Sequence, residues 1–181
     1  MRLDPARTLV AVVDIQERLI AAVPTADMLL GRALRLAEAA RLLGVRSVLT
    51  EQYPKGLGST PPALASLLPP AHVKTAFSCC GSEPFAAVID AEHSSLHAVV
   101  LCGLETHVCI AQTALDLLTR GLWVFVAVDA VGSRHEIDHQ IGLQRLAAAG
   151  AILTTTEAIL FEWLRDAAHP QFKAVQQLVR N

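Results

Sequence analysis

The most constraining feature of the sequence is an alternation of short, uninterrupted apolar runs with longer segments of helical periodicity. The runs at residues 8–13 and 122–128 contain no charged residue. Between such runs, apolar residues recur at every third or fourth position, which is the period of an α-helix. The predicted strands cover residues 8–13, 45–50, 72–74, 96–102, 122–128 and 151–154, and the predicted helices cover 28–43, 83–91, 108–120 and 135–149.

Strands that are apolar on both faces must be covered on both faces, and helices between them allow neighbouring strands to run parallel. The sequence therefore predicts an α/β fold: a three-layer, doubly wound, mainly parallel six-stranded sheet with helices on both faces. The chain has 181 residues. This length suits one domain, residues 1–181, with a substantial core.

Composition and charge exclude several classes of protein. Hydrophobic residues make up 52% of the chain and the net charge is −2, with Lys and Arg scattered along it. Neither nucleic acid nor a membrane is therefore an expected partner. The first ten residues contain an acid and a proline before the apolar run, unlike a signal peptide. The four cysteines lack C-x-x-C spacing, which favours free thiols and a cytoplasmic location.

Three chemically capable residues stand where predicted strands end. Asp14 ends the first strand, Lys74 ends the third, and Cys109 follows the fourth after the strand-breaking Gly103. Ligands of open parallel sheets collect at the carboxyl ends of the strands. Each residue alone has an ordinary structural explanation, since an aspartate can cap a helix, a lysine can be solvated and a cysteine can be inert core.

Cys109 has the setting of a reactive thiol. At the start of a predicted helix, free N–H groups and the helix dipole favour the thiolate, and a neighbouring lysine adds to this effect. At about 4 Å and an effective dielectric of about 20, such a pair is worth about 4 kcal/mol before desolvation, or about two to three pKa units. We therefore expect a lowered pKa for Cys109, with Asp14 as a base for its proton.

Four motifs resemble those of the isochorismatase-like cysteine hydrolases, which include nicotinamidases and N-carbamoylsarcosine amidohydrolases. The stretch from Thr50 to Gly58 is most similar to the branch called isochorismatase domain-containing proteins. The motifs span nearly the whole chain: Val12-Val-Asp-Ile-Gln16, Lys74-Thr-Ala-Phe-Ser78, Gly103-Leu-Glu-Thr-His-Val-Cys109 and Asp129-Ala-Val-Gly-Ser-Arg134.

The resemblance implies a catalytic triad of Asp14, Lys74 and Cys109. It also implies a non-proline cis peptide at Leu104–Glu105 and an oxyanion hole formed by the backbone N–H groups of Glu105 and Cys109. Homo-oligomers are common in the family. The residues expected to contact a small-molecule substrate are Gln16, Tyr53, Phe77, Leu104 and His107. For Gln16, orienting Asp14 and capping the next helix are open alternatives. For Tyr53 and Phe77 the alternative is packing, and for His107 it is an exposed structural position.

Two departures from the family narrow the chemistry. Nicotinamidases carry an Asp-x-His metal motif after the second strand, where this chain has Glu51-Gln-Tyr-Pro54. We therefore expect no metal and no cofactor, and we do not expect nicotinamide as the substrate. The isochorismate-cleaving members often lack the cysteine. Its presence here favours attack on an amide or related acyl carbon, and hence a hydrolase of C–N bonds other than peptide bonds.

A competing motif occurs at His135-Glu-Ile-Asp-His139, which fits the zinc-protease pattern H-E-x-x-H. Only Glu157 is a candidate third ligand. The motif begins a helix directly after a glycine–serine turn, and Asp138 occupies a spacer position that is usually apolar. We interpret it as a surface helix.

Three other features leave alternatives open. Cys79 and Cys80 are expected in the pocket wall or neutral core, and Cys102 in a buried strand. The apolar stripe at residues 161–179 predicts either core or, as we favour, a subunit contact. The alternatives to a cysteine hydrolase are a catalytically silent binding or scaffold protein of the same fold, and a thiol redox sensor that uses Cys79, Cys80 and Cys109.

Overall fold

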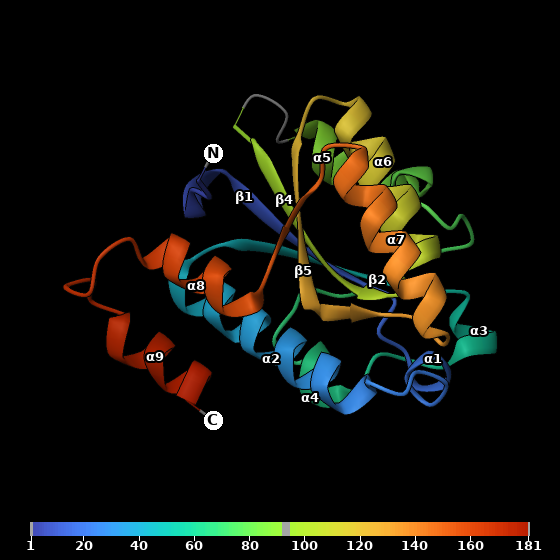
Figure 1. Ribbon diagram of the computed structural model, residues 1–181, viewed down its shortest axis with the longest axis horizontal. Helices are drawn as coiled ribbons and strands as arrows, with labels where there is room; N and C mark the ends of the chain where they lie inside the picture. Colours follow the sequence, from blue (N-terminus) through green and yellow to red (C-terminus); the bar gives the residue numbers. More distant parts are fainter. Residues whose placement is uncertain (1, 92–94, 181) are drawn as a thin grey trace.

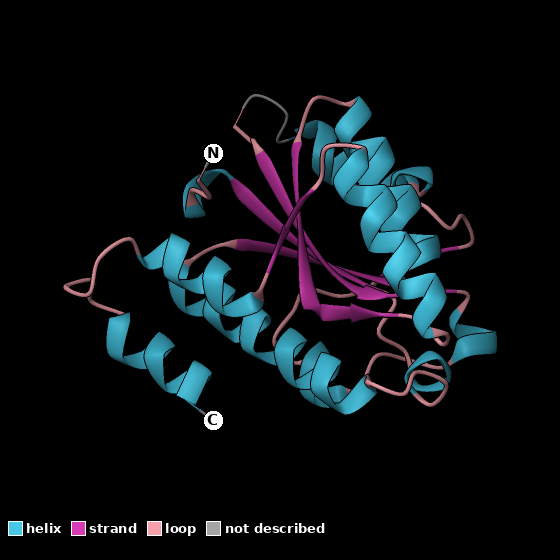
Figure 2. Cartoon of the chain, in the orientation of Figure 1, coloured by secondary structure: helices cyan, strands magenta, loops and turns pink. Residues whose placement is uncertain are grey.

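The sheet is the centre of the molecule, and it is parallel throughout (Figures 1 and 2). The computed structural model describes residues 2–91 and 95–180. The strand order is β3-β2-β1-β4-β5-β6, and every neighbouring pair is parallel. The strands are β1 (Thr8–Val13), β2 (Arg46–Gln52), β3 (His72–Lys74), β4 (Ala98–Leu104), β5 (Trp123–Gly132) and β6 (Ile152–Thr154).

Helices cover both faces of this sheet, so the predicted fold class is confirmed. Figure 2 shows the strands between two groups of helices. Three short turns accompany them: the 3₁₀ turns η1 (Pro5–Arg7) and η2 (Cys79–Gly81) and the π-helical turn η3 (Thr106–Ile110). The helices are α1 (Glu17–Ile20), α2 (Ala26–Leu43), α3 (Pro54–Leu57), α4 (Pro62–Ala65), α5 (Glu83–Ala91), α6 (Ala111–Thr119), α7 (Glu136–Ala148), α8 (Thr156–Leu164) and α9 (Phe172–Arg180).

The longest helix, α2, shows why these sequences form a buried layer. Leu29, Ala33, Leu36 and Ala40 follow one another at three- and four-residue spacing, and all four are buried against one face of the sheet. The helix ends at Gly44, whose φ of 67° is left-handed and suits glycine. Helices α8 and α9 pack on the same side, whereas α5, α6 and α7 cover the opposite face (Figure 1).

Strand β5 is longer than predicted, because it continues through Asp129 to Gly132. A carboxylate interrupts the apolar run at this point, which is why the sequence pattern ends at residue 128. The structure compensates this charge. The N–H and hydroxyl of Thr156 donate to one oxygen of Asp129 at 2.7 and 3.0 Å, and Arg32 lies 3.4 Å from the other.

The carboxyl-terminal stripe belongs largely to the core of the same chain. Trp163, Leu164 and Val175 are buried, whereas Phe161 is 38% exposed and makes an edge-to-face contact with Phe172. A break between α8 and α9 folds the stripe back on α2. At the three buried positions, the structure therefore favours core over the predicted subunit contact. Within the described ranges, no helix is long and apolar enough to cross a membrane.

Gly103 allows the two central strands to meet at their carboxyl ends. Its φ of 125° lies in the region that favours glycine, and a Cβ at this position would overlap with the carbonyl group of Val13 on β1. Val13 and Gly103 are partners in the register of β1 and β4. The last residues before Asp14 and before the Cys109 turn are thereby held in contact.

We predict that Gly103→Ala lowers the free energy of unfolding by at least about 3 kcal/mol, because the new methyl group meets backbone that cannot move aside. Urea unfolding monitored by circular dichroism measures this. Gly31→Ala in α2 is the matched control, since nothing lies within 4 Å of its added Cβ. This control is expected to gain up to about 1 kcal/mol. Equal stability of the Gly103→Ala and wild-type proteins would contradict the assignment.

Candidate active site

A fully buried ion pair lies at the carboxyl ends of the strands. Asp14 directly follows β1 with a left-handed φ of 52°, and Lys74 is the last residue of the edge strand β3. The Nζ of Lys74 lies 2.6 Å from Oδ2 of Asp14, and neither side chain is exposed. The two strands are separated by β2, so the pair ties together three strands of the sheet.

The lysine ammonium is surrounded by further acceptors. It donates to the Gln52 side-chain oxygen at 2.7 Å and to the carbonyl oxygens of Ala76 and Phe77 at 3.2 and 3.1 Å. Gln52 is held in turn, because its Nε2 donates to the carbonyl of Thr75 at 2.8 Å. A buried charge is tolerable when its hydrogen-bonding capacity is filled in this way.

The second carboxylate oxygen of Asp14 accepts a hydrogen bond from Thr50. The hydroxyl of Thr50 lies 2.8 Å from Oδ1 of Asp14, and the same hydroxyl is 3.7 Å from the sulfur of Cys79. Thr50 and Cys79 are both fully buried. Burial and the nearby Asp14 raise the pKa of the Cys79 thiol to about 11. Cys79 is therefore neutral core beneath the ion pair, one of the two predicted placements.

Cys109 lies in the π-helical turn η3, which connects β4 to α6. The turn forms because the N–H groups of Val108 and Ile110 both donate to the carbonyl oxygen of Glu105, at 3.1 and 3.2 Å. The predicted helix at 108–120 thus begins as a wider turn. Cys109 is 5% exposed, and its thiol is close enough to Asp14 and Lys74 for both charges to act on its pKa.

The expected lowering of the Cys109 pKa is wrong. Burial raises the pKa of this thiol to about 12, and the charge of Asp14 and its hydrogen bond with the thiol act in the same direction. Lys74 alone acts in the opposite direction, and it is already paired with the carboxylate. The resting site therefore contains a neutral thiol beside a carboxylate that can accept its proton, rather than a preformed thiolate.

The peptide bond between Leu104 and Glu105 is cis. The carboxylate of Glu105 accepts hydrogen bonds from the backbone N–H and the Nε of Arg134, both at 3.0 Å. Burial alone would raise the pKa of Glu105, but the hydrogen bonds and charge of Arg134 outweigh it and lower the pKa. This ion pair attaches the segment before the Cys109 turn to the loop after β5.

Of the five residues predicted to contact substrate, Tyr53 and Phe77 lie exposed beside Lys74, and the other three do not. Tyr53 and Phe77 are 55% and 54% exposed, and both adjoin Lys74, since the Tyr53 N–H donates to the Lys74 carbonyl and Lys74 donates to the Phe77 carbonyl. Leu104 is a fully buried core side chain. His107 is turned towards the loop after β5, where its Nδ1 lies 3.0 Å from the hydroxyl of Ser133.

Gln16 performs a structural task that neither sequence alternative described. Its Nε2 donates to the carbonyl oxygens of Gln52 and Gly58 at 3.0 and 2.6 Å, and its Oε1 accepts from the Gln52 N–H at 2.7 Å. The side chain is fully buried and provides no cap to the next helix. Gln16 thus holds the loop after β2 in place, and the structure gives no support to a substrate contact.

The H-E-x-x-H segment forms the first turn of α7. His135 precedes the helix, Glu136 begins it, and the Nδ1 of His139 lies 2.9 Å from the hydroxyl of Thr106. In the described part of the chain, no group of three or more His, Cys, Asp or Glu residues is arranged to hold a metal ion. Helix α7 packs closely on η3, because a Cβ at Gly142 would lie 3.2 Å from the Cα of His107.

Sequence reasoning missed Thr50 and Gln52, which hold Asp14 and Lys74 respectively. Both lie in β2, and their positions two residues apart put them on the same face of that strand. A polar pair on one face of the strand, directly after the buried Val48 and Leu49, was the available signal.

The chain is similar to known proteins in both sequence and fold. Residues 8–158 match the model of a family described as Isochorismatase domain. Isochorismatase domain-containing protein 2 of Bos taurus is 44% identical over 179 residues, which cover 99% of this chain and 86% of the relative.

Two solved structures are similar over nearly the whole chain. The MAR1 ribonuclease structure from Caenorhabditis elegans has a TM-score of 0.94 and 39% identity, and covers 100% of this chain and 93% of that one. The YcaC gene product of Escherichia coli, described as an octameric hydrolase of unknown specificity, has a TM-score of 0.86 and 26% identity. This likeness covers 99% of this chain and 96% of that one.

We predict that Asp14→Asn increases the rate at which iodoacetamide alkylates Cys109. The carboxylate raises the pKa of this thiol and Lys74 lowers it, so removal of the negative charge leaves the cation unopposed. At pH 7.5 the rate is expected to rise at least about tenfold, which corresponds to about one pKa unit. In the wild-type protein, the rate should climb with pH without levelling off below about pH 10. Peptide mapping by mass spectrometry follows Cys109, with the partly exposed Cys80 as the internal reference. A slower reaction in Asp14→Asn would contradict this account.

Thr50→Val should lower the free energy of unfolding by about 2–3 kcal/mol, because a buried carboxylate oxygen loses its donor while the side chain keeps its shape. Thr50→Ser retains the hydroxyl and should lose only about 1 kcal/mol. Urea titration of both variants separates the hydrogen bond from the packing. Equal losses in the two would assign no role to the hydrogen bond.

Proposed function

The chain belongs to the isochorismatase domain family, and from this premise we propose that it is a cysteine-dependent hydrolase. Its substrate is a small carboxamide or a related acyl compound, which forms a thioester with Cys109. The observation that carries the proposal is the contact of the Cys109 thiol with the buried Asp14–Lys74 pair. This contact joins a nucleophile, a base and a fixed positive charge in one site.

The first half of the reaction uses Asp14 as a general base. Asp14 accepts the Cys109 proton as the sulfur attacks the substrate carbonyl carbon, so no free thiolate is needed beforehand. Lys74 stabilises the negative charge that remains at the site. The backbone N–H groups of Glu105 and Cys109 donate to the carbonyl oxygen as it becomes an oxyanion.

The second half releases both products. The amine or ammonia leaves with the proton returned by Asp14, which regenerates the carboxylate. Asp14 then takes a proton from water, and the hydroxide attacks the thioester carbon. The carbon–sulfur bond breaks, the carboxylic acid leaves, and the proton on Asp14 returns to Cys109.

Tyr53 and Phe77 are the side chains that we propose to contact the substrate. Both are exposed and both adjoin Lys74, the last residue of the edge strand β3. Aromatic rings in such positions favour a planar group, which an amide or ureido group provides. The burial of Asp14, Lys74 and Cys109 favours a small molecule over a polymer.

The name of the Caenorhabditis elegans structure raises ribonuclease activity as a second possibility. Polyanion binding depends on clusters of Lys and Arg, whereas this chain has a net charge of −2. The cation of the site, Lys74, is fully buried and paired with Asp14. The charge arrangement therefore favours the acyl substrate, and hydrolysis of single-stranded RNA is measured beside the amides in the experiment below.

We further propose that the protein forms a homo-oligomer and is located in the cytoplasm. The octameric neighbour from Escherichia coli favours a homo-oligomer. Helix α7 carries an exposed apolar pair, Ile137 and Ile141, one turn apart. The cysteines in the described residues are all free thiols, which suits the reducing cytoplasm. The contact of the Cys109 thiol with the Asp14 carboxylate favours an active enzyme over a silent scaffold of the same fold.

We predict that Cys109→Ala abolishes turnover, because the thioester cannot form, and leaves thermal unfolding within a few degrees of wild type. Turnover is measured by product release from a panel of small carboxamides, ureido acids and esters, and hydrolysis of single-stranded RNA is assayed beside them. Acid-quenched wild-type protein should carry the acyl group on Cys109, detected by peptide mass spectrometry.

Cys80→Ala is the matched control and should keep full turnover, since Cys80 lies outside the triad. Full activity of Cys109→Ala would sink the proposal. Loss of activity in both variants, with a disulfide formed under mild peroxide, would favour the redox sensor instead.

A further inference from the structure

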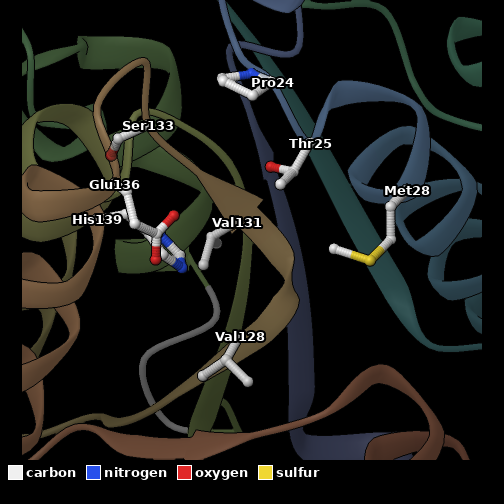
Figure 3. Close-up of a pocket in the computed structure, with 8 residues that line it drawn as sticks. All are labelled: Pro24, Thr25, Met28, Val128, Val131, Ser133, Glu136 and His139. Carbon is white, nitrogen blue, oxygen red and sulfur yellow. The ribbon is translucent and has the colours of Figure 1, made fainter.

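A cavity of about 350 Å³ lies beside β5, outside the Asp14–Lys74–Cys109 triad (Figure 3). It exists because β6 is short. β6 pairs with residues 125–127 of β5 only, so the side of β5 from Val128 onward faces the gap between α2 and α7. Figure 3 shows Val128 and Val131 on β5 between the two helices. The volume is that of a small-ligand pocket.

The cavity has one apolar wall and one polar wall. Met28, from the first turns of α2, is 55% exposed and faces β5 in Figure 3. Together with Val128 and Val131 it forms an apolar surface, and contact of such a surface with water is less favourable than contact with an apolar ligand. On the other side, Ser133, Glu136 and His139 line the cavity from the start of α7.

The polar wall offers hydrogen-bond acceptors. One oxygen of Glu136 accepts from the Gln140 amide at 2.9 Å, which leaves its other oxygen for a ligand. The Nδ1 of His139 lies 2.9 Å from the hydroxyl of Thr106. Within residues 2–91 and 95–180, its Nε2 has no hydrogen-bond partner. With the proton on Nδ1 and donated to Thr106, Nε2 is an acceptor.

The charges favour a positive ligand. Glu136 brings a negative charge, and none of the described residues that line the cavity is Lys or Arg. Arg134 follows the lining residue Ser133 in the chain and is paired with Glu105. Arg32 lies one helical turn after Met28 and is paired with Asp129. An anion would meet the Glu136 carboxylate with nothing to compensate it.

We propose that this cavity is a binding site for a small organic amine in its ammonium form. The apolar body of the ligand lies between Met28 and Val131. Its ammonium group donates to Glu136 and to Nε2 of His139. The site lies outside the hydrolytic triad. Two of its lining residues bond to η3, the turn that carries Cys109: His139 bonds to Thr106, and Ser133 bonds to His107.

The chain offers a direct reporter, because it contains two methionines and one of them is Met28. Protein labelled with ¹³C at the methionine methyl groups is titrated with benzylamine, and Met28→Leu identifies the Met28 signal. We expect a saturable shift of this signal. Benzyl alcohol and benzoate carry the same ring without the positive charge. Benzyl alcohol is expected to bind at least about tenfold more weakly, and benzoate to leave the signal unmoved.

Variants separate this site from the rest of the protein. Glu136→Gln should weaken benzylamine binding at least about tenfold and leave benzyl alcohol unchanged, since only the charge is removed. Glu83→Gln is the matched control, because Glu83 is also an exposed acid in the first turn of a helix, α5. Cys109→Ser should bind benzylamine as the wild type does, so the outcome does not depend on the hydrolase activity.

Three outcomes would overturn the proposal. One is a Met28 signal that benzylamine does not move. Another is equal binding of benzylamine, benzyl alcohol and benzoate, which would indicate an unspecific apolar surface. The third is a Met28 shift that follows protein concentration and ignores the amine, which would show that a second copy of the chain fills the cavity.

Discussion

The buried pair of Asp14 and Lys74 is the interaction on which the arrangement of the site depends. Moving two charges out of water costs several kcal/mol per ion, and attraction repays this only when the remaining donors and acceptors are also satisfied. Thr50, Gln52 and the carbonyls of Ala76 and Phe77 meet this condition. The loops after β1, β2 and β3 therefore have to adopt conformations that allow these bonds. The same conformations leave Tyr53 and Phe77 exposed beside Lys74.

The conformation of the backbone, rather than an attraction between side chains, places Cys109 beside this pair. Gly103 lets β4 run in contact with β1, and the π-helical turn η3 then carries Cys109 over the end of the sheet. The thiol is consequently buried and neutral. In the mechanism that we propose, a carboxylate positioned to remove the proton takes the place of a preformed thiolate. Such a thiol is also protected from casual oxidation, because oxidation follows thiolate character and exposure.

The sequence predicted the strands well because each central strand is an unbroken apolar run, and the ends of those runs located Asp14, Lys74 and Cys109. It failed where a property depends on partners from elsewhere in the chain. The pKa of Cys109 was expected to fall because the helix start and the lysine were visible in the sequence. The burial of the thiol, which is the largest cause of its raised pKa, depends on the packing of the whole chain. Gln16 was predicted to contact the substrate because the sequence does not reveal that its side-chain amide is hydrogen-bonded to backbone groups of Gln52 and Gly58. The extension of β5 was missed because the charge of Asp129 is compensated by Thr156 and Arg32.

Gly142 determines how closely α7 approaches the turn that carries Cys109. Since this residue has no side chain, the α7 backbone rests directly on His107 and Thr106, and the bond from His139 to Thr106 fastens the two together. The helix and the turn are therefore joined at two places along the first half of α7. The exposed side chains of Ile137 and Ile141 stand on this same stretch of helix. Whatever covers that exposed face consequently presses on a helix whose other side is packed against the turn that carries Cys109.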